Sequence, residues 1–113
     1  MKMIFVCSPY RGDIEANIAR AHRYCRFVAR SEAVPMAPHT IFTQWLDDND
    51  KEEREAGIYL GLEVLSRCDE VWVFGRHITE GMSKEITTAY SLHKPILYFN
   101  EKCEMIIDPR GGN

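Results

Sequence analysis

Short apolar runs alternate with longer segments of helical periodicity along the chain. Three of these runs have the length and composition of buried strands, at residues 3–7, 71–74 and 96–99. Residues 34–37 are shorter and contain Pro35, which favours an edge strand. Residues 103–107 are weakly patterned and allow one more edge strand, so we expect a sheet of four to five strands.

Apolar residues recur three and four positions apart in the segments between these runs. This spacing predicts helices at residues 14–31, 51–67 and 81–93, and a helical turn at residues 41–46. Asp13 is the expected N-cap of the first helix. The inner face predicted for that helix consists of Ile14, Ile18, Ala21, Cys25 and Val28.

Strands that alternate with helices need crossover connections, which produce a mostly parallel sheet covered by helices on both faces. Right-handed crossovers put the first strand in a central position and predict the strand order 2-1-3-4, with any fifth strand at the edge. The loops at residues 8–13 and 75–85 then face each other at the switch point, where open α/β sheets bind ligands. We therefore predict an α/β fold with a ligand site between these loops.

The composition suits one domain over residues 1–113, with a flexible tail over about residues 108–113. The net charge is −3 and the sequence shows no basic patch, which together disfavour nucleic-acid partners. No apolar run approaches membrane-spanning length, and the N-terminus does not resemble a signal peptide. These features predict a cytoplasmic protein that has no membrane partner.

The cysteines and histidines are too scattered to suggest a metal centre. No C-x-x-C pair and no H-x-x-x-H spacing occurs among them. We predict free thiols, no metal and no cofactor. The residues concerned are Cys7, Cys25, Cys68 and Cys103, and His22, His39, His77 and His93.

Glu85 is the strongest candidate for chemistry, because it lies near the start of a helix that follows a buried strand. Acids are also common in first helical turns, where most of them only stabilise the helix through a favourable interaction with its dipole. The facing loop offers Ser8 as a hydrogen-bonding hydroxyl, Arg11 as a fork for oxyanions and Gly12 for close backbone approach. Arg11 could instead form a surface ion pair with Asp13 or Glu15.

Two other loops have open interpretations. His39 follows the predicted edge strand and is a candidate contact to a base or phosphate. The acidic residues 47–50 form a solvated break before the second helix, or else they cap that helix or flank the mouth of a site. Neither a G-x-G-x-x-G nor a G-x-x-x-x-G-K-[ST] motif occurs, so dinucleotide-fingerprint and P-loop chemistry are not supported.

Several segments together resemble the nucleoside 2-deoxyribosyltransferase superfamily, which includes the 2′-deoxynucleoside 5′-phosphate N-hydrolases. They are Ile4-Phe5-Val6-Cys7-Ser8-Pro9-Tyr10-Arg11-Gly12, Gly81-x-x-x-Glu85-Ile86, Ala89 and His93-Lys94-Pro95-Ile96. The resemblance implies a flavodoxin-like three-layer sandwich that assembles as a homodimer or larger homo-oligomer. It also implies cleavage or transfer at the N-glycosidic bond of a small nucleoside or nucleotide.

By this resemblance Glu85 is the nucleophile, kept ionised by the helix start at Gly81, and the loop after the first strand holds the sugar or its 5′-phosphate. The substrate-binding residues expected on these grounds are Ser8, Tyr10, Arg11, Gly12, Asp13, His39, Gly81 and Met82.

Three positions depart from the pattern of the resembled superfamily. Phe5 replaces a tyrosine, and Gly61 and Gly75 replace acids, which leaves His77 or Glu80 as assisting groups. The sequence therefore predicts an N-hydrolase or deoxyribosyltransferase. The alternative is a non-catalytic nucleotide-binding or sensing module that retains the cleft.

Overall fold

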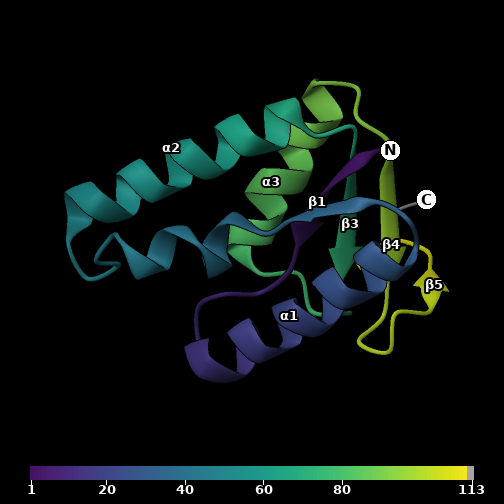
Figure 1. Ribbon diagram of the computed structural model, residues 1–113, viewed down its shortest axis with the longest axis horizontal. Coiled ribbons are helices and arrows are strands. Elements are labelled where there is room, and N and C mark those ends of the chain that lie inside the picture. The colour runs from purple at the N-terminus through teal and green to yellow at the C-terminus, as the bar shows by residue number, and fades with distance from the viewer. Residues whose placement is uncertain (112–113) are drawn as a thin grey trace.

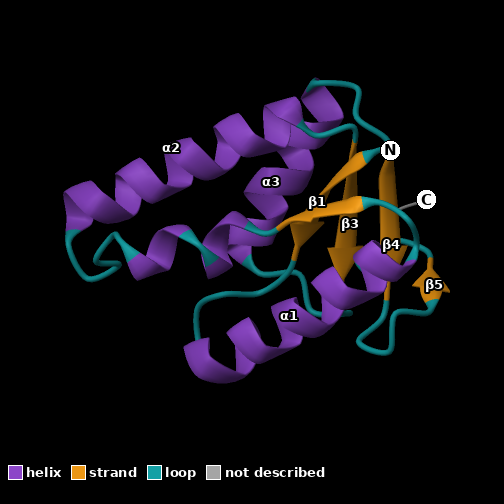
Figure 2. Cartoon of the chain, in the orientation of Figure 1, coloured by secondary structure: helices purple, strands orange, loops and turns teal. Residues whose placement is uncertain are grey.

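The computed structural model describes residues 1–111 and contains a five-stranded sheet of order β2-β1-β3-β4-β5. β2, β1, β3 and β4 are parallel neighbours, and β5 joins the edge antiparallel to β4. This arrangement confirms the predicted α/β class and strand order (Figure 2). The strands are β1 (Met3–Cys7), β2 (Val34–Met36), β3 (Glu70–Phe74), β4 (Ile96–Phe99) and β5 (Met105–Ile106).

Helices cover both faces of the sheet, as a flavodoxin-like three-layer fold requires. Figure 1 shows α1 (Ile14–Arg30) on one side and α2 (Lys51–Arg67) with α3 (Glu80–Ser91) on the other. Two short 3₁₀ helices, η1 (Pro38–Thr40) and η2 (Phe42–Gln44), connect β2 to α2, and η2 lies where a helical turn was predicted. No helix within residues 1–111 is both long and apolar enough to cross a membrane.

Alternating side chains of the central strands build two separate cores. Phe5 and Cys7 of β1 face α2 and α3, where they pack with Leu65 and Met82. Ile4 and Val6 of β1 face α1, in a core that is rich in aromatic side chains. In that core the ring of Phe74 stacks on Tyr24 with centroids 4.5 Å apart and on Phe99 at 5.1 Å.

The buried face of α1 differs from the predicted one. Asn17 is buried on it, whereas Ile14 is 40% exposed. The polar side chain is accommodated because its amide donates hydrogen bonds of 3.0 Å to the carbonyl oxygens of both Tyr10 and Arg11. Asn17 thereby fixes the loop between β1 and α1 from inside the fold.

α3 begins one residue earlier than predicted. Thr79 is its N-cap, and the hydroxyl of Thr79 accepts a hydrogen bond of 3.2 Å from the backbone N–H of Met82. Glu80 is therefore the first helical residue, and Glu85 lies in the second turn rather than the first.

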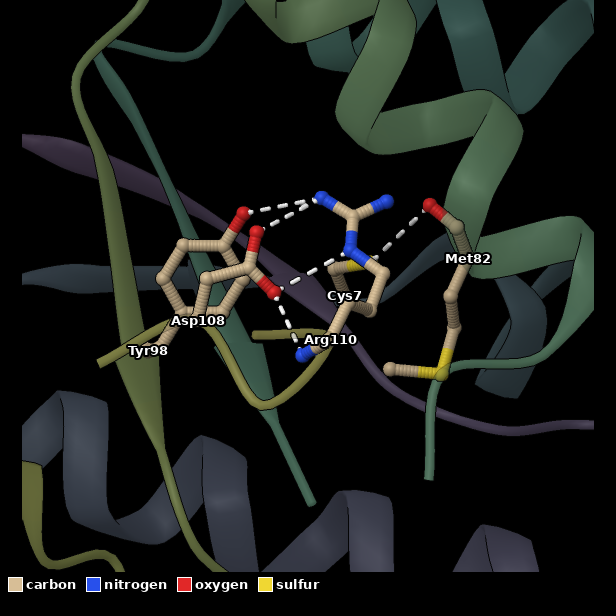
Figure 3. A network of polar contacts seen from close by, with 5 residues as sticks. All are labelled: Cys7, Met82, Tyr98, Asp108 and Arg110. Carbon is tan, nitrogen blue, oxygen red and sulfur yellow. Dashed lines mark hydrogen bonds and ion pairs between the residues drawn. The ribbon is translucent and has the colours of Figure 1, made fainter. Parts of the chain in front are cut away.

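The C-terminal segment, expected to be flexible from residue 108, is held by polar contacts in its described part. Arg110 donates hydrogen bonds to both carboxylate oxygens of Asp108, at 3.1 and 2.9 Å, and to the hydroxyl of Tyr98 at 3.3 Å (Figure 3). The guanidinium lowers the pKa of Asp108 to about 2. Residues 112 and 113 lie outside the described part of the chain.

Candidate functional site

A cavity of about 790 Å³ opens beyond the carboxyl ends of β1 and β3, bounded by α2, α3, η1 and η2. Its position is the one predicted from the strand order. Most of the candidate residues contribute to its lining: Ser8, Tyr10, Arg11, His39, Glu80, Gly81, Met82 and Glu85.

Three candidates do not line the cavity. Gly12 adopts a left-handed φ of +100°, so its role is in the turn before α1. Asp13 caps α1, where its carboxylate accepts a hydrogen bond of 3.1 Å from the N–H of Ala16. His77 lies exposed in the loop after β3.

Glu85 is partly buried in the lining of the cavity, and this burial raises its pKa from 4.5 to about 7. The sequence had predicted that the helix start keeps Glu85 ionised. The stabilisation of anions by a helix dipole falls off within the first turn. Because Glu85 lies in the second turn, burial outweighs the dipole, and near neutral pH the side chain exists in both protonation states.

Cys7 lies close to this carboxyl group. Its thiol is fully buried and donates a long hydrogen bond of 3.9 Å to the carbonyl oxygen of Met82 in α3 (Figure 3). Burial, with the nearby Glu85 second, raises the pKa of Cys7 well above its ordinary value, so Cys7 remains a thiol. The nearby polar thiol partly opposes the rise in the pKa of Glu85.

Ser8 and His39 form a second polar pair in the lining. The Ser8 hydroxyl and the His39 Nε2 are 3.3 Å apart, and the ring of Tyr10 meets the imidazole edge-on with centroids 6.0 Å apart. Burial lowers the pKa of His39 to about 4. His39 is therefore neutral at physiological pH, where it can exchange hydrogen bonds with a ligand but adds no positive charge.

An apolar wall completes the cavity. Its side chains come from η1, η2, the following loop and α2: Pro38, Phe42, Leu46, Ile58 and Leu62. Gly57 and Gly61 of α2 also face the cavity and contribute bare backbone. A lining that combines polar groups with an apolar wall suits a small ligand that has both kinds of surface.

The apolar side chains that α2 contributes were not among the predicted site residues, because helical periodicity does not distinguish apolar residues that line a cavity from those that fill a core. The glycines offered a usable signal, since two residues four positions apart in a helix lie on one face. A Cβ atom added to Gly61 would meet no other atom within 4 Å, whereas one added to Gly57 would lie 3.6 Å from Leu46 Cδ1.

Replacing Gly61 with alanine is expected to raise the free energy of unfolding by about 0.5–1 kcal/mol, because glycine in a helix costs backbone entropy. The added methyl group has room at this position. Urea unfolding of the parent and of Gly61→Ala measures the effect. Gly57→Ala serves for comparison, because its added Cβ atom makes an ordinary van der Waals contact with Leu46. A lower urea midpoint for Gly61→Ala alone would contradict the open space seen beside Gly61.

Charged side chains surround the mouth. Arg11 donates a hydrogen bond of 2.9 Å to Asp48 Oδ2, so it pairs with the acidic loop before α2 rather than with Asp13 or Glu15. Asp50 in that loop caps α2 by accepting from the N–H groups of Glu52 and Glu53. The acidic run therefore both caps the helix and flanks the cavity.

The three departing positions are accounted for in physical terms. Phe5 is buried in the core between the sheet and α2 and α3, and Gly75 adopts a left-handed φ of +96° that favours glycine. Gly61 lies at the cavity but carries no side chain. Of the two substitutes considered for the absent acids, Glu80 lines the cavity and His77 does not.

Within residues 1–111, no group of three or more His, Cys, Asp or Glu side chains is arranged to hold a metal ion. Aromatic side chains can stack on a nucleobase only where they line the cavity. Tyr10 lines the cavity, whereas Trp45 and Tyr90 are 69% and 78% exposed and lie outside its lining.

Solved structures of deoxyribosyltransferases share this fold. A 2-deoxyribosyltransferase from the psychrotolerant bacterium Bacillus psychrosaccharolyticus superimposes with a TM-score of 0.73 at 18% identity, over 92% of this chain and 76% of that chain. A 2-deoxyribosyltransferase from Leishmania mexicana gives a TM-score of 0.60 at 18% identity, over 88% of this chain and 65% of that chain. At this identity the comparison establishes a common fold, in agreement with the predicted superfamily resemblance.

Comparison with curated protein sequences finds no match. The family described as domain of unknown function DUF7768 matches residues 2–99. This range contains all three helices and every strand except β5. The chain therefore belongs to the DUF7768 family.

Proposed function

We propose that this protein cleaves or transfers the N-glycosidic bond of a 2′-deoxynucleoside or its nucleotide, with Glu85 as the nucleophile. The observation that carries the proposal is a partly buried carboxyl group, with a pKa of about 7, in the lining of a cavity of about 790 Å³. The shared fold adds support, because the similar chains are 2-deoxyribosyltransferases.

In the proposed reaction the ionised Glu85 carboxylate attacks the anomeric carbon of the sugar. The electron pair of the breaking C–N bond goes to the base, which also takes up a proton as it leaves. A glycosyl ester of Glu85 results. Water resolves this ester in hydrolysis, and a second base resolves it in transfer.

The lining supports a division of labour between sugar and base. Ser8 and the neutral His39 supply hydrogen bonds suited to sugar hydroxyls or to the edge of a base. Tyr10 and the apolar wall offer flat and apolar surface to a nucleobase. Glu80 is the candidate proton donor, although its side chain is exposed and lies 3.7 Å from the Lys84 ammonium.

A second candidate function is binding or sensing of the same ligands without turnover. It is favoured by the absence of acidic side chains at Gly61 and Gly75 and by the buried phenyl ring at position 5. General acid assistance of a departing base contributes roughly a hundredfold or more to the rate. A site that lacks it could retain affinity while losing most of its catalytic power.

We also infer a homo-oligomer from the superfamily resemblance. Tyr59 and Leu60 on α2 are 77% and 46% exposed and lie outside the cavity lining, so they are apolar surface available for contact with a second copy.

The test is incubation of the protein with each common 2′-deoxynucleoside and its 5′-monophosphate, with and without an added acceptor base, followed by chromatography of the products. We expect free base from at least one substrate, or a new nucleoside when an acceptor is present. Thermal stabilisation by a ligand without any base release would favour the sensing function instead. If no ligand stabilises the protein and no base appears, both functions are wrong.

A further inference from the structure

One ion pair connects two sides of the cavity mouth. Arg11 comes from the loop between β1 and α1, and Asp48 comes from the loop between η2 and α2, thirty-seven positions away in the sequence. Their charged atoms are 2.9 Å apart, and both side chains line the cavity. Arg11 is the residue expected to bind an anionic group of a ligand. In this structure the Asp48 carboxylate already occupies the Arg11 guanidinium.

The remaining charges of the lining do not favour an anion. The Lys84 ammonium is already paired with the Glu80 carboxylate at 3.7 Å. Among the cations of the lining within residues 1–111, only Arg54 has no ion pair. His39 is neutral. The acidic side chains of the lining outnumber the cations Arg11, Arg54 and Lys84, and they are Asp48, Glu53, Glu55, Glu80 and Glu85.

We propose that Asp48 is a specificity-determining residue that holds Arg11 and directs the cavity toward uncharged nucleosides and against their 5′-phosphates. This inference rests on the proposed function and names the substrate class of the same site. A phosphate that approaches Arg11 must displace the Asp48 carboxylate or remain beside it. Either arrangement leaves like charges close together at the rim of a partly enclosed cavity.

The selecting element is the charge of Asp48 rather than the strength of its bond to Arg11. The side chains of Arg11 and Asp48 are 59% and 27% exposed, and ion pairs exposed to this degree add little to stability. Removing the negative charge should therefore leave the fold intact. It should also free the Arg11 guanidinium for bidentate binding of a phosphate.

The test compares dissociation constants for one 2′-deoxynucleoside and its 5′-monophosphate, measured by titration calorimetry with the parent protein and with Asp48→Asn. We expect the parent to bind the nucleoside more tightly than the monophosphate. In Asp48→Asn the ratio of the two constants should shift toward the monophosphate by about tenfold, and less at high salt. Affinity for the nucleoside should change little.

Asp47→Asn is the matched control, because it makes the same change of charge one residue away and outside the cavity lining. Its amide oxygen can still accept the hydrogen bond that Asp47 accepts from the N–H of Asn49. Two results would overturn the role of Asp48 without affecting the proposed function. One is a parent protein that prefers the monophosphate, and the other is an equal shift of the ratio in Asp47→Asn and Asp48→Asn. If neither ligand binds any of these proteins, the proposed function itself fails, and the inference fails with it.

Discussion

Glu85→Gln is expected to release free base at least roughly a thousandfold more slowly than the parent, because a neutral amide is a poor nucleophile toward the anomeric carbon. The variant keeps the size and shape of the side chain in its partly buried position. Binding of the nucleoside should therefore persist while turnover is lost. Initial rates of base release, measured by chromatography under single-turnover conditions, give the ratio.

Glu80→Gln is the control for this loss. Glu80 lines the same cavity and belongs to the same helix, and glutamine removes the same charge there. We expect a smaller fall in rate for Glu80→Gln, up to roughly a hundredfold if Glu80 donates the proton to the base. Equal rates for the parent and Glu85→Gln would show that Glu85 is not the nucleophile.

The same Glu85→Gln variant is expected to be more stable than the parent at alkaline pH and equally stable in acid. The pKa of Glu85 rises from 4.5 to about 7 on folding, so between these values the folded chain binds a proton that the unfolded chain has released. The stability of the parent therefore decreases as pH rises through this interval. The difference of about 2.5 pKa units corresponds to roughly 3 kcal/mol.

Glutamine does not titrate. Subtracting the free energy of unfolding of the parent from that of Glu85→Gln therefore cancels the contributions of the other ionisable groups. Urea unfolding of both proteins should give similar free energies at about pH 4 and a difference approaching roughly 3 kcal/mol at about pH 8. A difference that does not vary with pH would show that Glu85 has an ordinary pKa in the folded chain. In that case the proposed proton balance of the site is wrong.

The sheet was predictable because local patterns determine it almost completely. The apolar runs around Val6, Val73 and Leu97 are strands at the expected places, and the right-handed crossover rule then orders them. The N-cap of α1 at Asp13 followed from local sequence in the same way.

The contents of the cavity were less predictable, because they depend on contacts between segments far apart in the chain. The pairing of Arg11 with Asp48 depends on where the loop before α2 lies, which periodicity does not reveal. The burial of Asn17 likewise depends on two carbonyl groups outside its helix. The ionisation of Glu85 was misjudged because a dipole argument uses helix position alone, whereas burial is a property of the assembled site.

The bare backbone at Gly61 also bears on how this site can evolve. A side chain can begin there without displacing a neighbour, at a wall of the same cavity that contains Glu85. Every glycine codon becomes a codon for aspartate or glutamate through a single-base change. An acid at this wall of the cavity is therefore one point mutation away, and under the proposed function that mutation is a short genetic route from a binding site to a more active catalyst.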